Sequence, residues 1–488
     1  MGQRVICCRR AIGYNHAVSA DERRSGSSDR HIQDMTTGSI PRHLIAFALP
    51  MLAGSLLQTT YIVVNAFWVG RYLKESALAA VTVSTPILIL MIAVAGGLTL
   101  ATNILIAQDI GAHTLERVQK VVQTSIVLVA AISLLLLVGG LLSAPYLLRH
   151  LLLVPPDIYP QACGFLHIAL WTVPCTFAIF LFSAMLRGIG DSKTPVYFQA
   201  ISVVLNVILD PLFMLGKLGF PRLGIDGAAW ATLFAQTTAA IALLYYITHH
   251  CRVIRPDLWH PQIDRHVMLV LLMIGLPAML QQSVVSISLL GITRYVSAFG
   301  TLADAAFGAA LRIDNVAFLP AMTMGLAIST VAGQNIGAQY YGRAREVFWW
   351  GLLLSVSISL LISTVVISMP QVFLHFFIRN PIAVAEGIRY LHIVGITYVL
   401  YAVMFAANGV INGAGQTLAT TIISVISLWG IRLPLAALLP HITHNQTGIW
   451  YAMLISVAVG MIMSLLYYAS GRWQCRVENG QSAVNSDE

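Results

Sequence analysis

Two stretches of the chain, LIAQDIGAHTLERVQKVV at 105–122 and TVAGQNIGAQYYGRAREV at 330–347, are copies of one motif. The shared Gln-x-Ile-Gly-Ala lies 226 residues further along in the second copy. A second pair has nearly the same offset, because LRGIGDSKTP begins at Leu186 and INGAGQTLAT begins at Ile411. The chain therefore contains an internal repeat, with one copy in each half.

The composition of the chain excludes an ordinary soluble enzyme. Of its 488 residues, 57% are hydrophobic and only 10% are charged, and the mean hydropathy is +0.78. Soluble domains carry about 25% charged residues. A bilayer core about 30 Å thick takes about 20 helical residues to cross, so a chain of this length has room for many spans. The composition predicts an integral membrane protein.

Apolar blocks separated by Gly, Pro or charged residues predict an all-α protein with twelve transmembrane helices. Strands are excluded because period-two alternation is missing and lipid does not tolerate open sheet edges. The expected spans are 44–68, 78–107, 121–144, 161–183, 196–216, 227–247, 267–292, 303–333, 346–368, 388–410, 417–439 and 447–469. Because the repeat offset equals six spans, an even number, both halves have the same orientation. We therefore expect two six-helix lobes related by a pseudo-two-fold axis along the membrane normal.

Charge in the loops predicts the orientation. Counted by alternate loops, 18 Lys and Arg residues lie on the side of the two termini and nine on the other, with Arg432 among the nine. Without the residues before Met35, an alternative start of translation, the count is 12 against nine. The sign of this bias predicts cytoplasmic termini. The expected organisation is a disordered cytoplasmic tail at 1–40, an N-terminal lobe at 41–250, an inter-lobe loop at 251–266, a C-terminal lobe at 267–471 and a cytoplasmic tail at 472–488.

The fifth expected span carries a polar stripe with one carboxylate. Gln199, Ser202, Asn206 and Asp210 fall within an arc of about 80° on a helix. An unpaired carboxylate in a bilayer costs about 2.5 to 3.5 kcal/mol, so Asp210 is a functional candidate by default. The alternative is that Asp210 only pairs near a helix end, close to Pro211.

The chemistry of this carboxylate suits an exchange of ions. Removal from water favours the neutral acid and a nearby cation favours the charged form, so a proton and a cation compete for Asp210. Such competition is the basis of antiport. One proton exchanged for one monovalent cation moves no net charge, so only the pH gradient would drive it, at about 1.4 kcal/mol per pH unit. An offset of 225 places Ile431 opposite Asn206 and Leu435 opposite Asp210, which favours ion coupling in the N-terminal lobe alone.

Other spans carry polar groups that are candidates for substrate contact. They comprise Gly54, Gln58, Tyr61 and Asn65 on the first span and Gln282, Ser286 and Thr293 on the seventh. Such stripes are at least as often contacts between packed helices, so both readings stay open. Arg312 and Asp314 near the start of the eighth span either take part in transport or pair with other groups.

Several of these elements resemble the multidrug and toxic compound extrusion (MATE) family, in particular its bacterial branch with an ion site in the N-terminal lobe. The resemblance rests on SAMLRGIGDSKTPVYFQAISVVLNVILDPLFM at 183–214, LGIDGAAWAT at 223–232, GQNIGAQ at 333–339 and GRW at 471–473. It implies a V-shaped pair of lobes that export organic cations or other amphipathic compounds in exchange for protons or sodium.

The resemblance also implies an ion site, which falls on Asn65, Asn206, Asp210 and Thr232. Asn65 stands where the family commonly has a carboxylate. Another branch uses a carboxylate on the tenth helix, and Tyr401 or a neighbour stands in its place. We expect Gln58, Tyr61, Gln199, Gln282 and Tyr401 to contact the substrate.

The resulting hypothesis is a multidrug efflux antiporter that works by alternating access and is not an enzyme. We expect no cofactor and no bound metal beyond the coupling proton or sodium ion, drug-like small molecules and the lipid bilayer as partners, no nucleic acid, and a monomer in the inner membrane. The alternative is a flippase for a lipid-linked precursor, which shares the architecture but needs cationic groups for phosphates. A membrane-embedded enzyme would need a nucleophile and base or a metal cluster, and the sequence presents neither.

Overall fold

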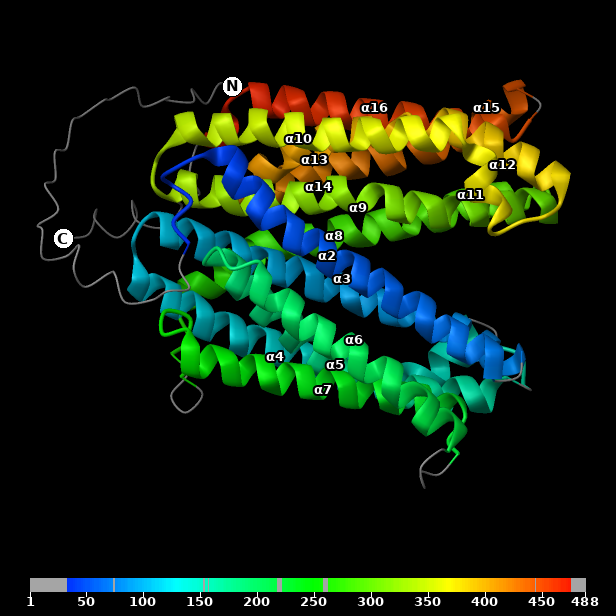
Figure 1. Ribbon diagram of the computed structural model, residues 1–488, viewed down its shortest axis with the longest axis horizontal. Coiled ribbons are helices and arrows are strands. Elements are labelled where there is room, and N and C mark those ends of the chain that lie inside the picture. Colours follow the sequence, from blue (N-terminus) through cyan, green and yellow to red (C-terminus); the bar gives the residue numbers. More distant parts are fainter. Residues whose placement is uncertain are drawn as a thin grey trace, which may run out of the picture.

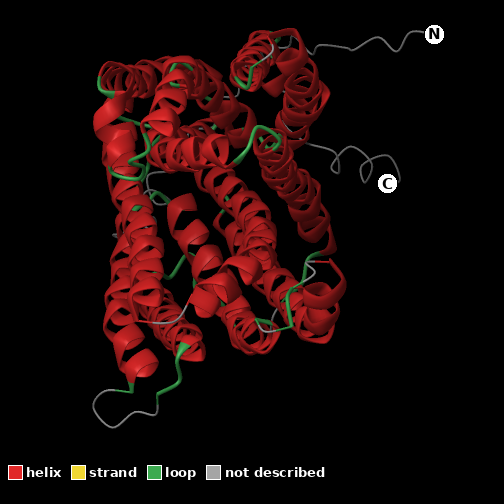
Figure 2. Cartoon of the chain, turned by 90° about the vertical axis from the view of Figure 1, so that its right-hand side faces the viewer, coloured by secondary structure: helices red, strands yellow, loops and turns green. Residues whose placement is uncertain are grey.

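Helices account for nearly all of the fold. The structure, a computed structural model, describes residues 33–72, 75–151, 154–156, 158–216, 222–257, 262–443 and 445–474. Within these residues twelve helices are long and apolar enough to cross a membrane. No strand occurs in the same ranges (Figure 2). The predicted number of spans and the all-α class are confirmed.

The first half contributes six spanning helices. They are α2 (Ile40–Tyr72), α3 (Glu75–Gly111), α4 (Leu115–Tyr146), α5 (Tyr159–Gly188), α6 (Lys193–Leu215) and α7 (Ile225–His250). A π-helical turn, η2 (Leu147–Leu151), extends α4. α6 ends where Gly216 takes a left-handed conformation, with φ of 69°, which residues with a side chain adopt at a steric cost.

The second half repeats this order with two interruptions. Its continuous spans are α8 (Arg265–Ser297), α9 (Thr301–Gly337), α10 (Tyr341–Ser368) and α16 (Thr447–Ala469), and α11 (Pro370–His375) and η5 (Arg472–Gln474) are short. The tenth span is broken into α12 (Pro381–Val394) and α13 (Thr397–Gly413). The eleventh consists of α14 (Thr417–Val425), the π-helical η4 (Ile426–Arg432) and α15 (Leu433–Thr443). Neither interruption was predicted from the apolar pattern.

The two halves form the arms of a V (Figure 1). They meet where the repeated motif ends α3 and α9, and they diverge toward the opposite end. At the junction the side-chain amide of Asn103 on α3 donates to the Thr330 hydroxyl on α9 over 3.0 Å. Gln108 reaches across in the same way and donates to the backbone carbonyl of Gly413 over 2.7 Å. The motif that reveals the repeat in the sequence therefore joins the two halves.

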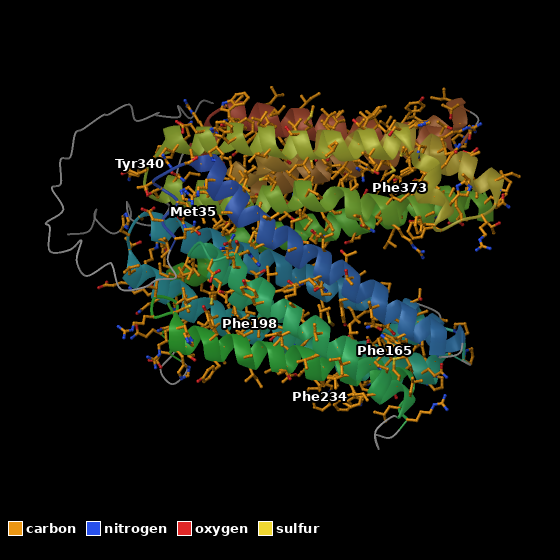
Figure 3. The ribbon with its side chains drawn as sticks, in the orientation of Figure 1. Met35, Phe165, Phe198, Phe234, Tyr340 and Phe373 are labelled. Carbon is orange, nitrogen blue, oxygen red and sulfur yellow. The ribbon has the colours of Figure 1, made fainter. Side chains whose placement is uncertain are left out.

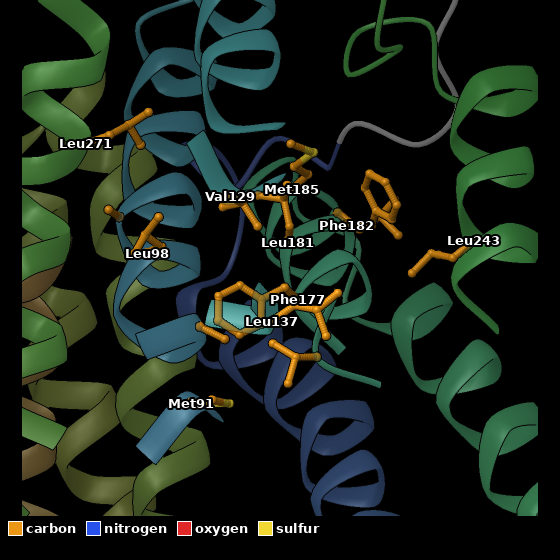
Figure 4. Close-up of a cluster of buried hydrophobic side chains, with 14 of the residues drawn as sticks. Met91, Leu98, Val129, Leu137, Phe177, Leu181, Phe182, Met185, Leu243 and Leu271 are labelled. Carbon is orange, nitrogen blue, oxygen red and sulfur yellow. The ribbon is translucent and has the colours of Figure 1, made fainter. Parts of the chain in front are cut away.

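The first helix of each half begins against the other half. Ile40 and Leu44 of α2 belong to a buried cluster with Ile328 of α9, and α2 then crosses to pack along α6. At the start of α8, Leu271 belongs to a cluster in the first half together with Leu98 of α3 (Figure 4). This exchange buries both helix starts at the closed end of the V.

Both ends of the described chain are packed rather than free. Met35 is fully buried at the closed end (Figure 3), and its backbone N–H donates to the Gln334 side chain over 3.0 Å. Trp473 is 1% exposed and stacks on Tyr468. The tails expected at 1–40 and 472–488 are therefore wrong at their inner edges, because residues 33–40 and 472–474 belong to the folded part. Residues 1–32 and 475–488 lie outside the described ranges.

Candidate functional site: a polar cluster around Asp210

Asp210 lies in the interior of the first half. It is on α6, and its side chain is 0% exposed. Asn206 lies one helical turn earlier on the same face and is 2% exposed. The periodicity of the stripe explains this placement, since residues four apart lie one above the other on a helix. Val203, Phe213 and Met214 are apolar members of the same buried face.

The amide of Asn206 bridges the carboxylate and the next helix. With its nitrogen toward Asp210, it donates to Oδ2 over 3.0 Å. Its oxygen then accepts from the hydroxyl of Thr232 at 3.1 Å and from the backbone N–H of Thr232 at 3.2 Å. The reverse orientation would set the amide oxygen against the carboxylate, so the hydrogen-bond network assigns this one.

The cluster extends onto the first spanning helix through a tyrosine. The hydroxyl of Tyr61 on α2 lies 3.1 Å from Oγ1 of Thr232 on α7. Tyr61 also interacts with the side chain of Asn65 and, through space, with the Asp210 carboxylate. The structure thus brings together the four residues that the resemblance assigned to an ion site, Asn65, Asn206, Asp210 and Thr232. Tyr61, expected at the substrate, joins them as a fifth member.

The carboxylate has fewer hydrogen bonds than a buried anion requires. Oδ2 of Asp210 accepts from Asn206, whereas Oδ1 has no hydrogen-bond partner among the described residues. A buried carboxylate with one neutral donor is costly as a bare anion. A proton on Asp210, or a cation held by its oxygen together with those of Asn206, Thr232 and Tyr61, removes this cost. Oxygen atoms of this kind are ligands that suit a proton or a sodium ion.

Gln199 of the fifth span and two residues of the first span, Gly54 and Gln58, form a seam between α2 and α6. Gln199 donates to the side-chain oxygen of Gln58 over 2.8 Å. Gly54 faces Val196 so closely that a Cβ on the glycine would lie 3.2 Å from a Val196 methyl. These contacts support the helix-packing interpretation of Gly54 and Gln58. The expected contact of Gln58 and Gln199 with substrate stays a prediction.

The second half contains its own buried polar groups. Asp314 on α9 is 3% exposed and accepts hydrogen bonds from the hydroxyls of Tyr390 and Tyr398, over 2.5 Å and 2.6 Å. Arg312, the other intramembrane candidate, is exposed and lies over the ring of Phe377 at 5.4 Å. Asp314 therefore agrees with the interpretation that it pairs with other groups, which lie in the protein interior. Arg312 lies outside the interior.

Arg432 corrects an expectation of the sequence analysis. It was counted among the outer loop cations, but it ends η4 inside the eleventh span and is 7% exposed. Its Nε donates to Ser456 over 2.9 Å and its Nη2 to the hydroxyl of Tyr401 over 3.0 Å. Tyr401, which stands where another branch has a carboxylate, therefore contacts a cation.

Each half joins its fifth span to its sixth through a polar contact. Asn206 bonds Thr232 on the sixth span, and Arg432 bonds Ser456 on the twelfth. The contact in the first half adjoins the carboxylate of Asp210, whereas the contact in the second half involves a buried cation.

Gln282, the last predicted substrate contact, is exposed on α8, whereas its neighbour Gln281 donates to Ser424 over 2.9 Å. Sequence analysis did not predict Tyr390 and Tyr398 as site residues. The available signal was that both are tyrosines in a charge-poor span, one on each side of Gly395. Nothing in the spacing linked them to Asp314.

Comparison with known proteins agrees with this architecture. The MatE family model matches residues 50–212 and 277–438, one block in each half. The chain belongs to the MatE family. Two Bacillus subtilis relatives are both named probable multidrug resistance proteins. YpnP is 31% identical over 90% of the chain and 97% of its own length, and YoeA is 29% identical over 89% and 95%.

Solved structures share the fold of this MatE protein. A multidrug resistance MATE family transporter of the MOP superfamily in an outward-facing conformation has a TM-score of 0.84 at 22% identity, over 90% of the chain and 97% of its own. A MOP superfamily transporter from Pyrococcus furiosus, described as having a binding pocket of reverse polarity, has a TM-score of 0.84 at 21% identity, over 90% and 97%. The protein is a multi-pass membrane transporter of the multidrug efflux type.

Proposed function

We propose that this MatE protein exports organic cations or amphipathic compounds in exchange for protons or sodium, and that Asp210 is the coupling group. The observation that carries the proposal is the buried Asp210 carboxylate, which one neutral amide donor contacts. A proton or a sodium ion satisfies its remaining oxygen, and only one of them does so at a time. Ion entry from one side and release to the other therefore change the charge within the first half once per cycle.

The V shape supports alternating access. The arms join at the end that carries Met35 and Trp473, and they diverge at the other (Figure 1). With cytoplasmic termini, this arrangement opens outward. Moving Arg432 from the outer loops into the membrane leaves 18 loop cations against eight, which supports that orientation more strongly than the original count.

Asn65 bears on the choice and the number of coupling ions. It interacts with the Tyr61 hydroxyl rather than supplying a second negative charge. A single carboxylate exchanges one positive charge, so export of a monovalent cation through this site is electroneutral. We place the protein in the inner membrane as a monomer that works without a cofactor.

The experiment is efflux of a fluorescent organic cation from proteoliposomes, under a proton or a sodium gradient imposed one at a time. Asp210→Asn should abolish gradient-driven efflux and leave the protein folded and inserted. Asp304→Asn, which alters a carboxylate hydrogen-bonded to Ser297 at the start of α9, is the matched control and should retain efflux. Undiminished efflux by Asp210→Asn would overturn the proposal.

A flippase for a lipid-linked precursor is the second candidate, and the buried Arg432 favours it, because a phosphate-bearing substrate needs a cation at membrane depth. Arg432 already donates to Ser456 and Tyr401, both neutral, and so keeps its charge for such a ligand. Translocation of a labelled lipid-linked phosphate without any ion gradient, lost in Arg432→Gln, would establish the flippase instead.

A further inference from the structure

A second buried carboxylate lies outside the Asp210 site. Each oxygen of Asp314 accepts one tyrosine hydroxyl, Oδ2 from Tyr390 over 2.5 Å and Oδ1 from Tyr398 over 2.6 Å. Both tyrosines are 0% exposed. Three side chains from three helices are thus held together by two short hydrogen bonds to one ionisable group.

The two tyrosines stand on opposite sides of the break in the tenth span. Tyr390 is on α12, which ends at Val394, and Tyr398 is on α13, which begins at Thr397. Hydroxyl groups satisfy the carbonyls at the break: Ser363 donates to Gly395 over 2.8 Å, and Thr397 donates to Val394 over 2.6 Å. Because its backbone groups are satisfied, the joint can persist in the membrane interior. Asp314 therefore ties both pieces of the broken helix to α9.

The other groups that face this cluster do not neutralise Asp314. From η4, Arg432 interacts with Tyr390 through space but donates hydrogen bonds to Ser456 and Tyr401. From α9 itself, Arg312 turns outward over Phe377. α10 contributes the neutral hydroxyl of Ser363, and α16 contributes Trp450, which packs edge-on against the Tyr390 ring. Among the described residues, the salt bridges join other pairs of side chains and do not include Asp314.

Protonation of this carboxylate changes which bonds it can accept. An ionised Asp is an acceptor at both oxygens, so two tyrosine O–H groups fit it. Once one oxygen carries a proton, that oxygen becomes a donor, and the tyrosine facing it must turn its own O–H away. The contact also loses its charge assistance, which makes a hydrogen bond about twice as strong. The tether to one piece of the broken helix then weakens while the other persists.

We propose that Asp314 is a second proton-binding site, and that in its charged form it latches α12 and α13 to α9 and fixes the angle between them. Protonation releases one piece, so the tenth span changes its bend at Gly395. By linkage, any conformation that draws a tyrosine away from Asp314 binds the proton more tightly. This site is independent of Asp210 and stands whether or not Asp210 couples transport.

The test measures protonation and bend separately in the full-length protein. Infrared difference spectra between alkaline and acidic buffer report the carboxylic acid C=O stretch. Spin labels on Ile382 of α12 and Leu302 of α9, exposed by 60% and 39%, report the distance between these helices in a background without native cysteines. We expect one component of the carboxylic acid band to disappear in Asp314→Asn and to persist in Asp210→Asn. The distance between the labels should change over the same pH interval.

The variants separate a latch from a merely structural contact. Tyr390→Phe and Tyr398→Phe remove one donor each and keep the ring, so the distance change should shift to higher pH in both. Tyr451→Phe, at a tyrosine that is 44% exposed on α16, is the matched control and should leave the transition unchanged. The proposal is overturned if Asp314 shows no protonation band, or if the distance change survives in Tyr390→Phe and Tyr398→Phe at the wild-type pH. The proposal is also overturned if the distance change is lost in Asp210→Asn but not in Asp314→Asn.

Discussion

Gly111 lies directly against the backbone carbonyl of Gln334, so closely that a Cβ on the glycine would lie 1.9 Å from that oxygen. Gly337 meets the carbonyl of Gln108 in the same way, also at 1.9 Å. These reciprocal contacts join α3 to α9 at the closed end of the V. Only a residue without a side chain permits this approach, which accounts for the repeated Gly in the motif.

Gly111→Ala should therefore move α3 and α9 apart at the closed end of the V. Insertion of a methyl group into a tight contact costs about 1 to 3 kcal/mol, and the protein avoids this cost in conformations where the arms part. Spin labels on Leu115 and Tyr340, exposed by 45% and 53%, should report a longer distance in the variant. Gly139→Ala, where a Cβ would meet no atom within 4 Å, is the control. An unchanged distance in Gly111→Ala would show that the contact does not hold the end closed.

Thr232→Val should weaken the coupling site without unfolding it. Valine keeps the shape but removes the hydroxyl between Asn206 and Tyr61. Loss of one hydrogen-bonding partner costs about 1 to 2 kcal/mol, so the ion concentration for half-maximal efflux should rise about five- to thirtyfold. Thr232→Ser should restore it, and Thr238→Val on the exposed face of α7 should have no effect. Equal ion dependence in Thr232→Val and the wild type would exclude this hydroxyl from the site.

Arg432→Met should leave the protein at least as stable as the wild type. The buried guanidinium donates to two neutral hydroxyls, and it takes part in no salt bridge among the described residues. An apolar side chain of similar length removes the cost of desolvating the charge, which for buried ionic groups amounts to about 1 kcal/mol or more. Thermal unfolding in detergent measures this, with the exposed Arg294→Met as the control. A clearly lower unfolding temperature would mean that the two hydrogen bonds outweigh desolvation.

Asp264→Ala should destabilise the start of α8. The Asp264 side chain accepts from the backbone N–H groups of His266 and Val267, over 2.8 Å and 3.2 Å. Loss of such a cap lowers the free energy of unfolding by about 1 kcal/mol. Asp264→Asn should retain most of the stability because asparagine also caps helices. Denaturation of both variants in the same detergent distinguishes a cap from a requirement for charge.

The sequence predicted the site in the first half better than the one in the second. Asn206 and Asp210 lie four residues apart on one helix, so periodicity alone placed them on the same face. Asp314 meets Tyr390 and Tyr398 across 76 and 84 residues of sequence. No period joins residues on different helices, so this cluster could not be predicted from spacing. Arg432 was misplaced because it was counted with the outer loop although the predicted span 417–439 already contained it.

The amino-acid sequence by itself determined the twelve spans, the repeat and the polar stripe with Asp210. These follow from hydropathy and helical period, which act between residues close together in the chain. Only the tertiary structure decided that Tyr61 joins the Asp210 cluster, that Arg432 is buried, and that Asp314 ties together a helix broken at Gly395. Such contacts arise where separate helices pack, because there each buried polar group must find a partner on whichever helix lies beside it.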